Sequence, residues 1–324
     1  MKRYYRGKPS DHFDGISFFD LVENQKTTFK DVLKWQMGRK KSFWPKSIPL
    51  LKTDSPPERV YGKELRVSNV GHATFLIQTE GLNLLTDPIW SKRASPFSFA
   101  GPKRVVDPGI PFEDLPPIDI VWISHNHYDH LDLKTVSRLW KAHSPRIVTP
   151  LGNDTIIQSS YKDIQVETMD WGESLKISKS FSLHFTPSQH WSARGIFDRN
   201  RALWGALTIA APGGNLYFVG DSGYGDGRYF KKDKEIFGSY RLAILPMGAY
   251  EPRWMMKYSH MNPEEMVMAH QDLGMPTTIP SHFDVFKLTD EGFGEAKSLL
   301  QKALERLKSK EKVQVLGIGQ SLLL

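Results

Sequence analysis

A short apolar run that leads directly into four potential metal ligands is the feature that most restricts the fold of this chain. Residues 118–123 are mostly apolar and predict a buried strand, and His125, His127, Asp129 and His130 follow it within six residues. Ligands placed between a strand and a following helix sit on backbone that the core holds in place, so the pattern predicts a preformed metal site. A polar loop with solvated histidines is the simpler alternative, and the density of the cluster disfavours it.

Composition limits the chemistry of such a site. The 324 residues include no cysteine, which excludes thiolate ligands and disulfides. Imidazole and carboxylate groups must therefore supply every protein ligand, and this donor set suits zinc and related divalent ions.

Three later positions extend the ligand set. His190, Asp221 and His282 each come just after an apolar segment that predicts a strand. Alone, each would be interpreted as a structural histidine or a turn residue. Together with the first motif they predict two metals, the first held by His125, His127 and His190, the second by Asp129, His130 and His282, with Asp221 as a bridge. A hydroxide held between two such cations forms near neutral pH and favours phosphoester hydrolysis.

Two strand-rich blocks, each followed by helices, predict an α/β (α+β) chain in which two mixed β-sheets pack together and helices cover them outside. The expected strands are 65–70, 74–78, 82–86, 118–123, 146–149, 164–168, 174–177, 181–186, 206–210, 216–219, 242–245, 277–280 and 313–317. The expected helices are 27–37, 133–142, 153–161, 228–237, 263–273 and 290–308. We expect a hydrolase domain over residues 61–324, preceded by a basic and aromatic extension over residues 1–60.

The excess positive charge of the chain lies in its N-terminal arm. Residues 1–46 hold 11 Lys or Arg and 5 Asp or Glu, whereas the remaining residues are nearly balanced, so a nucleic-acid partner is not expected. The arm combines an amphipathic helix with lysines and aromatics, which suits peripheral contact with a membrane surface, although a helix packed on the body explains the same pattern. The sequence shows neither a secretory signal nor an apolar run of ~20 residues. It therefore predicts a cytoplasmic protein whose contact with a membrane, if there is one, is peripheral.

Several motifs resemble those of known hydrolases. The run from His125 to His130 and three further motifs, Gly71-His72-Ala73-Thr74, Thr86-Asp87-Pro88 and Gly220-Asp221-Ser222, resemble the metallo-β-lactamase superfamily. Within it, the motifs Gly101-Pro102-Lys103-Arg104, Leu115-Pro116-Pro117-Ile118-Asp119, Thr186-Pro187-Ser188-Gln189-His190-Trp191 and Gly248-Ala249-Tyr250-Glu251-Pro252-Arg253-Trp254 resemble the N-acylphosphatidylethanolamine-hydrolysing phospholipase D family. The similarity spans about residues 65–285.

This resemblance implies a metallo-β-lactamase αββα sandwich with two zinc ions. It implies hydrolysis of N-acylphosphatidylethanolamine-type phospholipids to N-acylethanolamine and phosphatidic acid, and it is compatible with a homodimer. The expected catalytic residues are Asp129, Asp221 and His260, with His260 near the substrate phosphate. His72 is assigned to support of the fold.

Further side chains have secondary expected roles. Asp87 is expected to orient a ligand imidazole, although an Asp-Pro turn explains it equally well. The expected substrate contacts are Tyr128, Ser98, Phe99, Tyr250 and Arg253. Ser98 and Phe99 stand where animal members carry a polar pair, and Asp284 follows the last metal motif, so headgroup selectivity and pocket charge are expected to differ.

Two alternatives keep the fold but change the function. A soluble hydrolase of a small phosphorylated metabolite or lactone would use the same ligands. A non-catalytic lipid-binding protein would require a broken site, whereas all seven ligand positions are filled. Asp221 in place of a cysteine disfavours a zinc β-lactamase, and His127 in place of a glutamate disfavours a di-iron oxidase.

Overall fold

The computed structural model shows two β-sheets packed face to face, as the sequence predicts, and it describes residues 4–20, 28–39, 42–50, 53–309 and 312–324. The first sheet has the order β13-β1-β2-β3-β4-β5-β6 and the second the order β12-β11-β10-β9-β8-β7. The strands of the first sheet are β1 (Leu65–Gly71), β2 (Thr74–Thr79), β3 (Leu82–Thr86), β4 (Ile120–Trp122), β5 (Arg146–Pro150), β6 (Val166–Met169) and β13 (Ser321–Leu323). Those of the second are β7 (Ser174–Lys176), β8 (Ser182–Thr186), β9 (Ala206–Ala210), β10 (Asn215–Phe218), β11 (Tyr240–Pro246) and β12 (Thr277–Ser281).

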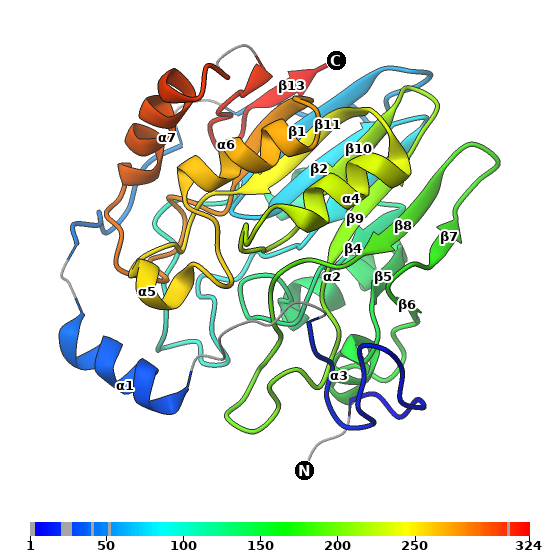
Figure 1. The fold of residues 1–324 in the computed structure, drawn as a ribbon. Helices are drawn as coiled ribbons and strands as arrows, with labels where there is room; N and C mark the ends of the chain where they lie inside the picture. The colour runs from blue at the N-terminus through cyan, green and yellow to red at the C-terminus, as the bar shows by residue number, and fades with distance from the viewer. Residues whose placement is uncertain (1–3, 21–27, 40–41, 51–52, 310–311) are drawn as a thin grey trace.

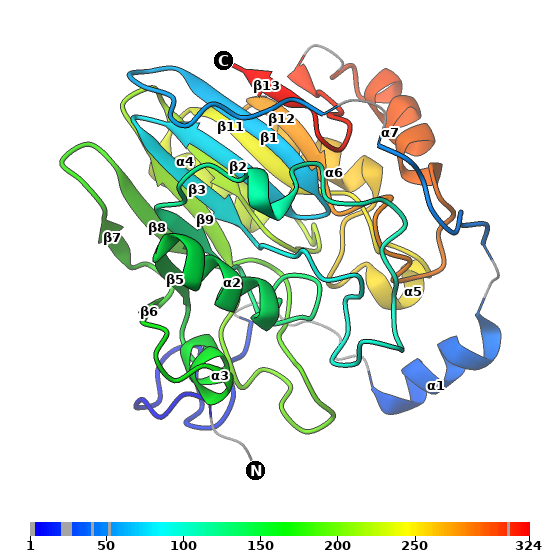
Figure 2. The same ribbon diagram turned by 180° about the vertical axis from the view of Figure 1, so that it is seen from behind.

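Helices cover the outer face of each sheet (Figures 1 and 2). They are α1 (Phe29–Gly38), α2 (Leu133–His143), α3 (Asn153–Ser160), α4 (Arg228–Phe237), α5 (Arg253–Met256), α6 (Pro263–Asp272) and α7 (Glu295–Arg306), with a 3-10 turn at Phe112–Asp114. Figure 1 shows α4 and α6 in front of the second sheet, and Figure 2 shows α2 and α3 in front of the first. The αββα sandwich is therefore confirmed.

Alternate side chains of the strands explain the layering. On β4, Ile120 and Trp122 face the core between the sheets, whereas Val121 faces the core under α2 and α3. On β11, Ile244 faces the inter-sheet core, whereas Ala243 packs under α4 and α6. Strands buried on both faces carry apolar residues at successive positions, which is why these segments appear in the sequence as continuous apolar runs.

The strand directions bring the ends of several strands together. β3 and β4 are parallel neighbours, as are β10, β11 and β12. β8 runs antiparallel to β9, which runs antiparallel to β10, so β8 points the same way as β10. Residues that follow β3 and β4, and those that follow β8, β10 and β12, therefore gather at one end of their sheet.

Three predictions about elements are wrong. Residues 313–317 form no strand apart from a bridge between Val313 and Thr278, and the last strand is β13. The C-terminal helix begins at Glu295 rather than residue 290, because Asp290 and the following loop bind the N-terminal arm and Gly294 adopts a left-handed conformation. The short helix α5 has no counterpart among the predicted helices because one helical turn carries no usable periodicity.

The described residues of the N-terminal arm contact the body at several places. Phe13 and Phe18 are buried in the core between the sheets. Farther along, the indole of Trp35 donates to the Asp290 carboxylate, and the indole of Trp44 donates to the Glu291 carbonyl. The domain boundary at residue 60 stays a prediction, and Lys40 and Lys41 of the arm lie outside the described residues.

Asp233 of α4 is a buried carboxyl in the outer layer whose titration should make stability depend on pH. Burial raises the pKa of Asp233 from 3.8 to about 7, although Thr186 donates a hydrogen bond to the carboxyl over 3.0 Å. Between these two pH values the folded state keeps a proton that the unfolded state has lost. Stability should therefore fall as pH rises from about 4 to about 7.

Replacing Asp233 with Asn should remove this pH dependence. We expect Asp233→Asn to raise the free energy of unfolding at pH 8 by roughly 1–4 kcal/mol and to change it little at pH 4, as measured by urea denaturation. Glu235→Gln on the exposed face of the same helix is the matched control. Equal effects of Asp233→Asn at both pH values would contradict the prediction.

Candidate metal centre

The structure brings all seven predicted ligands together at the ends of four strands, and it adds His72. His125, His127, Asp129 and His130 follow β4, while His190, Asp221 and His282 follow β8, β10 and β12. His72 occupies the turn between β1 and β2. His72, Asp87 and His282 have φ of 63°, 34° and 64°, a left-handed conformation that is costly for non-glycine residues.

The first of two pockets is formed by His125, His127, His190 and Asp221. His127 Nδ1 lies 2.9 Å from His125 Nε2 and 3.2 Å from His190 Nε2. Asp221 Oδ2 lies 3.9 Å from His125 Nε2 and 3.8 Å from His190 Nε2. Four donor atoms therefore converge on one small volume.

The second pocket is formed by His72, Asp129, His130 and His282. Asp129 Oδ2 lies 3.0 Å from His72 Nε2, 3.2 Å from His282 Nε2 and 3.5 Å from His130 Nε2. His72 is the residue that the sequence interpretation underestimated. Its signal was present, because it stands at a strand end like the other ligands and beside a glycine like Asp221, but the motif was assigned to the fold.

Asp221 lies between the two pockets. Its Oδ2 atom is 3.2 Å from both His130 Nε2 and His282 Nε2, and it also faces the first pocket. Burial opposes ionisation, but the neighbouring His282 and His130 hold the pKa of Asp221 well below its ordinary value. The side chain is therefore a charged carboxylate shared by both ligand groups.

Burial keeps the imidazoles of the first pocket neutral. Desolvation lowers the pKa of His127 to about 3, and it lowers the pKa of His125 and His190 well below 6.5. Neutral imidazole is the form that binds metal, because its free ring nitrogen carries a lone pair.

A second layer of hydrogen bonds fixes the orientation of two ligand rings. The Asp87 carboxylate accepts from the Ser124 amide and the Ser124 hydroxyl and lies against His130 Nδ1, each over 2.6 Å. The Ser259 carbonyl lies 2.9 Å from His190 Nδ1. Both contacts require a proton on Nδ1 and leave Nε2 free toward the site, as in metal-binding histidines.

Unpartnered buried atoms indicate that this donor set fits metal ions. His130 Nε2 and Asp221 Oδ1 are buried and have no hydrogen-bond partner within the part of the chain that the structure describes. Imidazole nitrogens only 2.9–3.2 Å apart need a shared cation or proton between them. Neutral imidazoles grouped around charged carboxylates match the ligands of zinc and similar ions.

The predicted substrate contacts differ in their surroundings and in whether they face the metal centre. His260 faces it, with Nδ1 3.8 Å from Asp221 Oδ2, and Tyr250 is buried with its hydroxyl unpaired among the described residues. Tyr128 donates from its hydroxyl to the Arg194 carbonyl. Ser98 and Phe99 lie on the exposed long loop after β3. Whether these side chains touch a substrate stays a prediction.

Arg253 and Asp284 are committed to contacts within the protein. The Arg253 guanidinium forms two 2.7 Å bonds to the Glu265 carboxylate and donates to the His260 carbonyl over 3.0 Å. It therefore holds the segment that carries Ser259 and His260. Asp284 accepts from the Gly294 amide over 2.8 Å and pairs with Lys297 over 3.3 Å, so its charge is balanced away from the two pockets.

A sandwich of this topology with two His/Asp pockets at its strand ends defines a metal-dependent hydrolase. A family model described as a beta-lactamase superfamily domain matches residues 82–283, and the chain belongs to that superfamily. Its curated relatives place it with the N-acyl-phosphatidylethanolamine-hydrolyzing phospholipase D family.

Three individual comparisons describe the similarity. N-acyl-phosphatidylethanolamine-hydrolyzing phospholipase D 1 of Caenorhabditis elegans is 38% identical over 73% of this chain and 68% of its own length. An uncharacterized protein of Mycobacterium tuberculosis is 32% identical over 93% of this chain and 79% of its own length. A solved metallo hydrolase from Ignicoccus hospitalis has a TM-score of 0.58 at 20% identity, covering 81% of this chain and 98% of that one, which supports the fold alone.

Proposed function

We propose that this protein is a dizinc phosphodiesterase that hydrolyses N-acylphosphatidylethanolamine-type phospholipids to N-acylethanolamine and phosphatidic acid. The main support is the pair of His/Asp pockets that share Asp221. The substrate class rests on the relative from C. elegans and on the motifs shared with its family. When bound, the two metals would supply Lewis acidity and a water of lowered pKa.

The protein's own groups would hold and position the reactants. His125, His127 and His190 would hold one ion and Asp129, His130 and His282 the other, with His72 beside Asp129 and Asp221 between the pockets. A phosphodiester between the pockets would lie next to His260, whose partly exposed imidazole can donate a hydrogen bond to a phosphoryl oxygen.

The N-terminal arm supports peripheral contact with a membrane. On α1, Leu33 and Met37 are exposed apolar side chains, and Lys34 lies 4.9 Å above the Trp254 ring. Figure 1 shows α1 standing away from both sheets. An exposed apolar helix face with lysines is suited to an interface. Within the described ranges, no helix combines the length and apolar character that crossing a membrane requires.

Hydrolysis of N-acylphosphatidylethanolamine in mixed micelles by the zinc-loaded protein tests the proposal. We expect release of N-acylethanolamine and phosphatidic acid, and we expect a chelator or His127→Ala to remove this activity. His184→Ala is the matched control, since His184 lies on β8 between Ser174 and Ser182, away from the pockets. Activity on a soluble phosphodiester with none on the lipid would reject the substrate and favour a small phosphorylated metabolite.

A further inference from the structure

Three of the ligand imidazoles differ in what holds them from behind. The Asp87 carboxylate holds the His130 ring at Nδ1. The Ser259 carbonyl holds the His190 ring in the same way. By contrast, His282 Nδ1 is buried and has no hydrogen-bond partner among the described residues. The direction of the His282 ring toward the second pocket therefore depends on the backbone that carries it.

The backbone at His282 is strained and closely packed. Its φ of 64° is a left-handed conformation that a non-glycine residue keeps only when its surroundings impose it. On one side, the His282 amide donates to the His72 carbonyl over 3.0 Å. On the other side, Gly248 lies so close that a Cβ added to it would be 1.7 Å from the His282 carbonyl oxygen. The backbone at Gly248 is therefore a support for this ligand.

A single buried carboxylate, that of Glu291, holds the 248–251 loop. Glu291 Oε1 accepts from the Ala249 amide over 2.7 Å. Glu291 Oε2 accepts from the Glu251 amide over 3.3 Å and also from the Thr289 hydroxyl. Ala249 has a φ of 57°, so this loop also needs partners outside it to keep its conformation. The Glu291 carboxylate therefore determines the shape of the loop that packs on the metal ligand.

The surroundings of Glu291 are costly for a carboxyl group. Glu291 is 8% exposed, and no cation pairs with it within the part of the chain that the structure describes. Burial raises the pKa of Glu291 from 4.5, and the hydrogen bonds from Thr289 and the two loop amides oppose this rise. Because only these hydrogen bonds offset the cost of burial, Glu291 and the loop fix each other in place.

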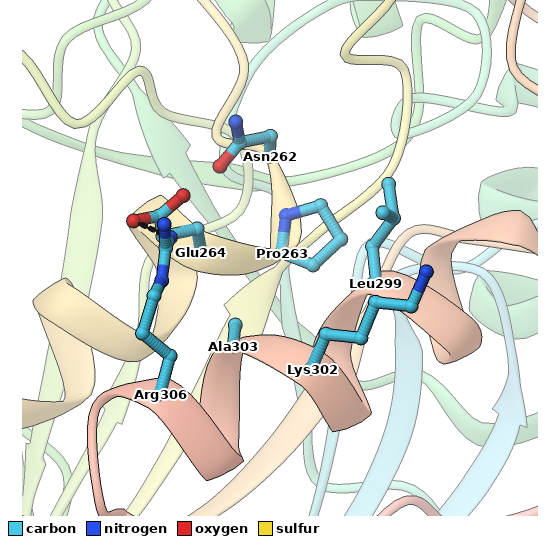
Figure 3. Close-up of a pocket in the computed structure, with 7 residues that line it drawn as sticks. All are labelled: Asn262, Pro263, Glu264, Leu299, Lys302, Ala303 and Arg306. Carbon is cyan, nitrogen blue, oxygen red and sulfur yellow. Dashed lines mark ion pairs between the residues drawn. The ribbon is translucent and has the colours of Figure 1, made fainter.

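Glu264 on α6 shows the more usual arrangement of a glutamate. It is partly exposed beside a cavity of about 330 Å³ between α6 and α7, and it pairs with Arg306 (Figure 3). Such a pair is solvated and contributes little to stability. Glu291 differs in both respects, because it is buried and its partners include the amides of a loop that contacts a metal ligand.

We propose that Glu291 is a positioning residue for the second metal pocket. Its carboxylate keeps the 248–251 loop packed against the backbone of His282. This contact directs His282 Nε2 toward Asp129 Oδ2 and Asp221 Oδ2, each 3.2 Å away. The inference rests on the two-metal centre of the proposed function, and it is independent of the substrate.

The effect of Glu291 should be confined to one metal ion. Two ligands of the first pocket are held by other segments. His125 Nδ1 lies 2.9 Å from the Ser124 hydroxyl, and His190 is held by the Ser259 carbonyl. Loss of the Glu291 carboxylate therefore weakens the second pocket and spares the first. A carboxylate that served only the fold would weaken both pockets alike.

Zinc binding measured by competition with a chelator tests the role of Glu291 without reference to turnover. We expect the parent to bind two zinc ions, and Glu291→Gln to bind one of them about 10- to 100-fold more weakly and the other unchanged. The amide keeps the size of the carboxyl group but turns an NH₂ group toward donors that need an acceptor. The matched control is Asp290→Asn, because the Asp290 carboxylate accepts from Trp35 and Arg39 of the N-terminal arm. This control should bind both zinc ions like the parent.

A second variant tests the same contact from its other side. Gly248→Ala leaves Glu291 intact but places a methyl group against the His282 carbonyl, so it should weaken binding of the same zinc ion. Excess zinc should restore the turnover of a soluble phosphodiester to Glu291→Gln, since the ligands themselves are unchanged. This second variant keeps the proposal testable if Glu291→Gln folds poorly.

The remaining outcomes separate the role of Glu291 from the proposed activity. Parent-like affinity for both zinc ions in Glu291→Gln would overturn the proposal, and so would an equal loss of both ions or an equal loss in Asp290→Asn. Binding of a single zinc ion by the parent would reject the two-metal centre before any variant is made. Parent zinc binding without hydrolysis of N-acylphosphatidylethanolamine would reject the proposed substrate and leave the role of Glu291 intact.

Discussion

Replacement of Asp221 with alanine is expected to abolish hydrolysis, lowering kcat by roughly a thousandfold or more. Asp221 Oδ2 is the atom that both pockets share, at 3.2 Å from His130 and His282 and 3.8 Å from His190. Its loss removes the carboxylate that the two pockets share and leaves the first pocket with imidazoles alone, without the charge that balances a divalent ion. We therefore expect metal content to fall together with activity.

The measurement is metal stoichiometry by mass spectrometry beside turnover of a soluble phosphodiester. Asp226→Ala is the matched control, because Asp226 lies a few residues farther along the chain in an exposed pair with Arg228, and such pairs contribute little. A variant at Asp221 that keeps both metals and measurable turnover would show that this carboxylate is not the shared ligand.

Much of this site was predictable because its residues follow strands that have strong signals. The apolar runs before His125, Asp221 and His282 correspond to β4, β10 and β12, and parallel pairing carries the residues after them to one end of the sheets. The local apolar run shows where a buried strand ends, and crossover connections make neighbouring strands parallel, so ligands at strand ends have a predictable position.

Residues whose role depends on long-range partners were not predictable. Arg253 was expected to contact the substrate, and the sequence gives no sign that its guanidinium pairs with Glu265, a capping residue of α6. His72 appeared to support the fold, but the turn between β1 and β2 brings it within 3.0 Å of Asp129. No local periodicity in the sequence signals either contact, because each contact joins segments that the packing of the sheets brings together.

The same reasoning explains the ambiguity at Asp87. In the sequence, Thr86-Asp87-Pro88 fits an ordinary turn as well as a ligand-orienting carboxylate. In the structure Asp87 is fully buried, and its carboxylate lies 2.6 Å from the Ser124 amide, the Ser124 hydroxyl and His130 Nδ1. An ordinary turn residue would be exposed to solvent, whereas Asp87 is buried against the His130 imidazole on the side away from the pocket.

Two substitutions of Asp87 should therefore have different consequences. Asp87→Ala leaves the buried Ser124 amide unpaired and should lower the free energy of unfolding by about 3 kcal/mol. Asp87→Asn keeps the shape and an acceptor for that amide, but it can place an NH₂ group against His130 Nδ1. That group would force Nδ1 to accept, so the ring proton would move to Nε2, the nitrogen that faces Asp129 and Asp221.

We expect Asp87→Asn to lose about 10- to 100-fold in zinc affinity, measured by chelator competition, while the metal-free protein unfolds within about 1 kcal/mol of the parent. Asp107→Asn, on the exposed part of the long loop, is the control and should change neither quantity. Parent-like zinc affinity in Asp87→Asn would show that the tautomer of His130 is set elsewhere. Equal destabilisation by Asn and Ala would show instead that Asp87 serves the fold and not the ligand.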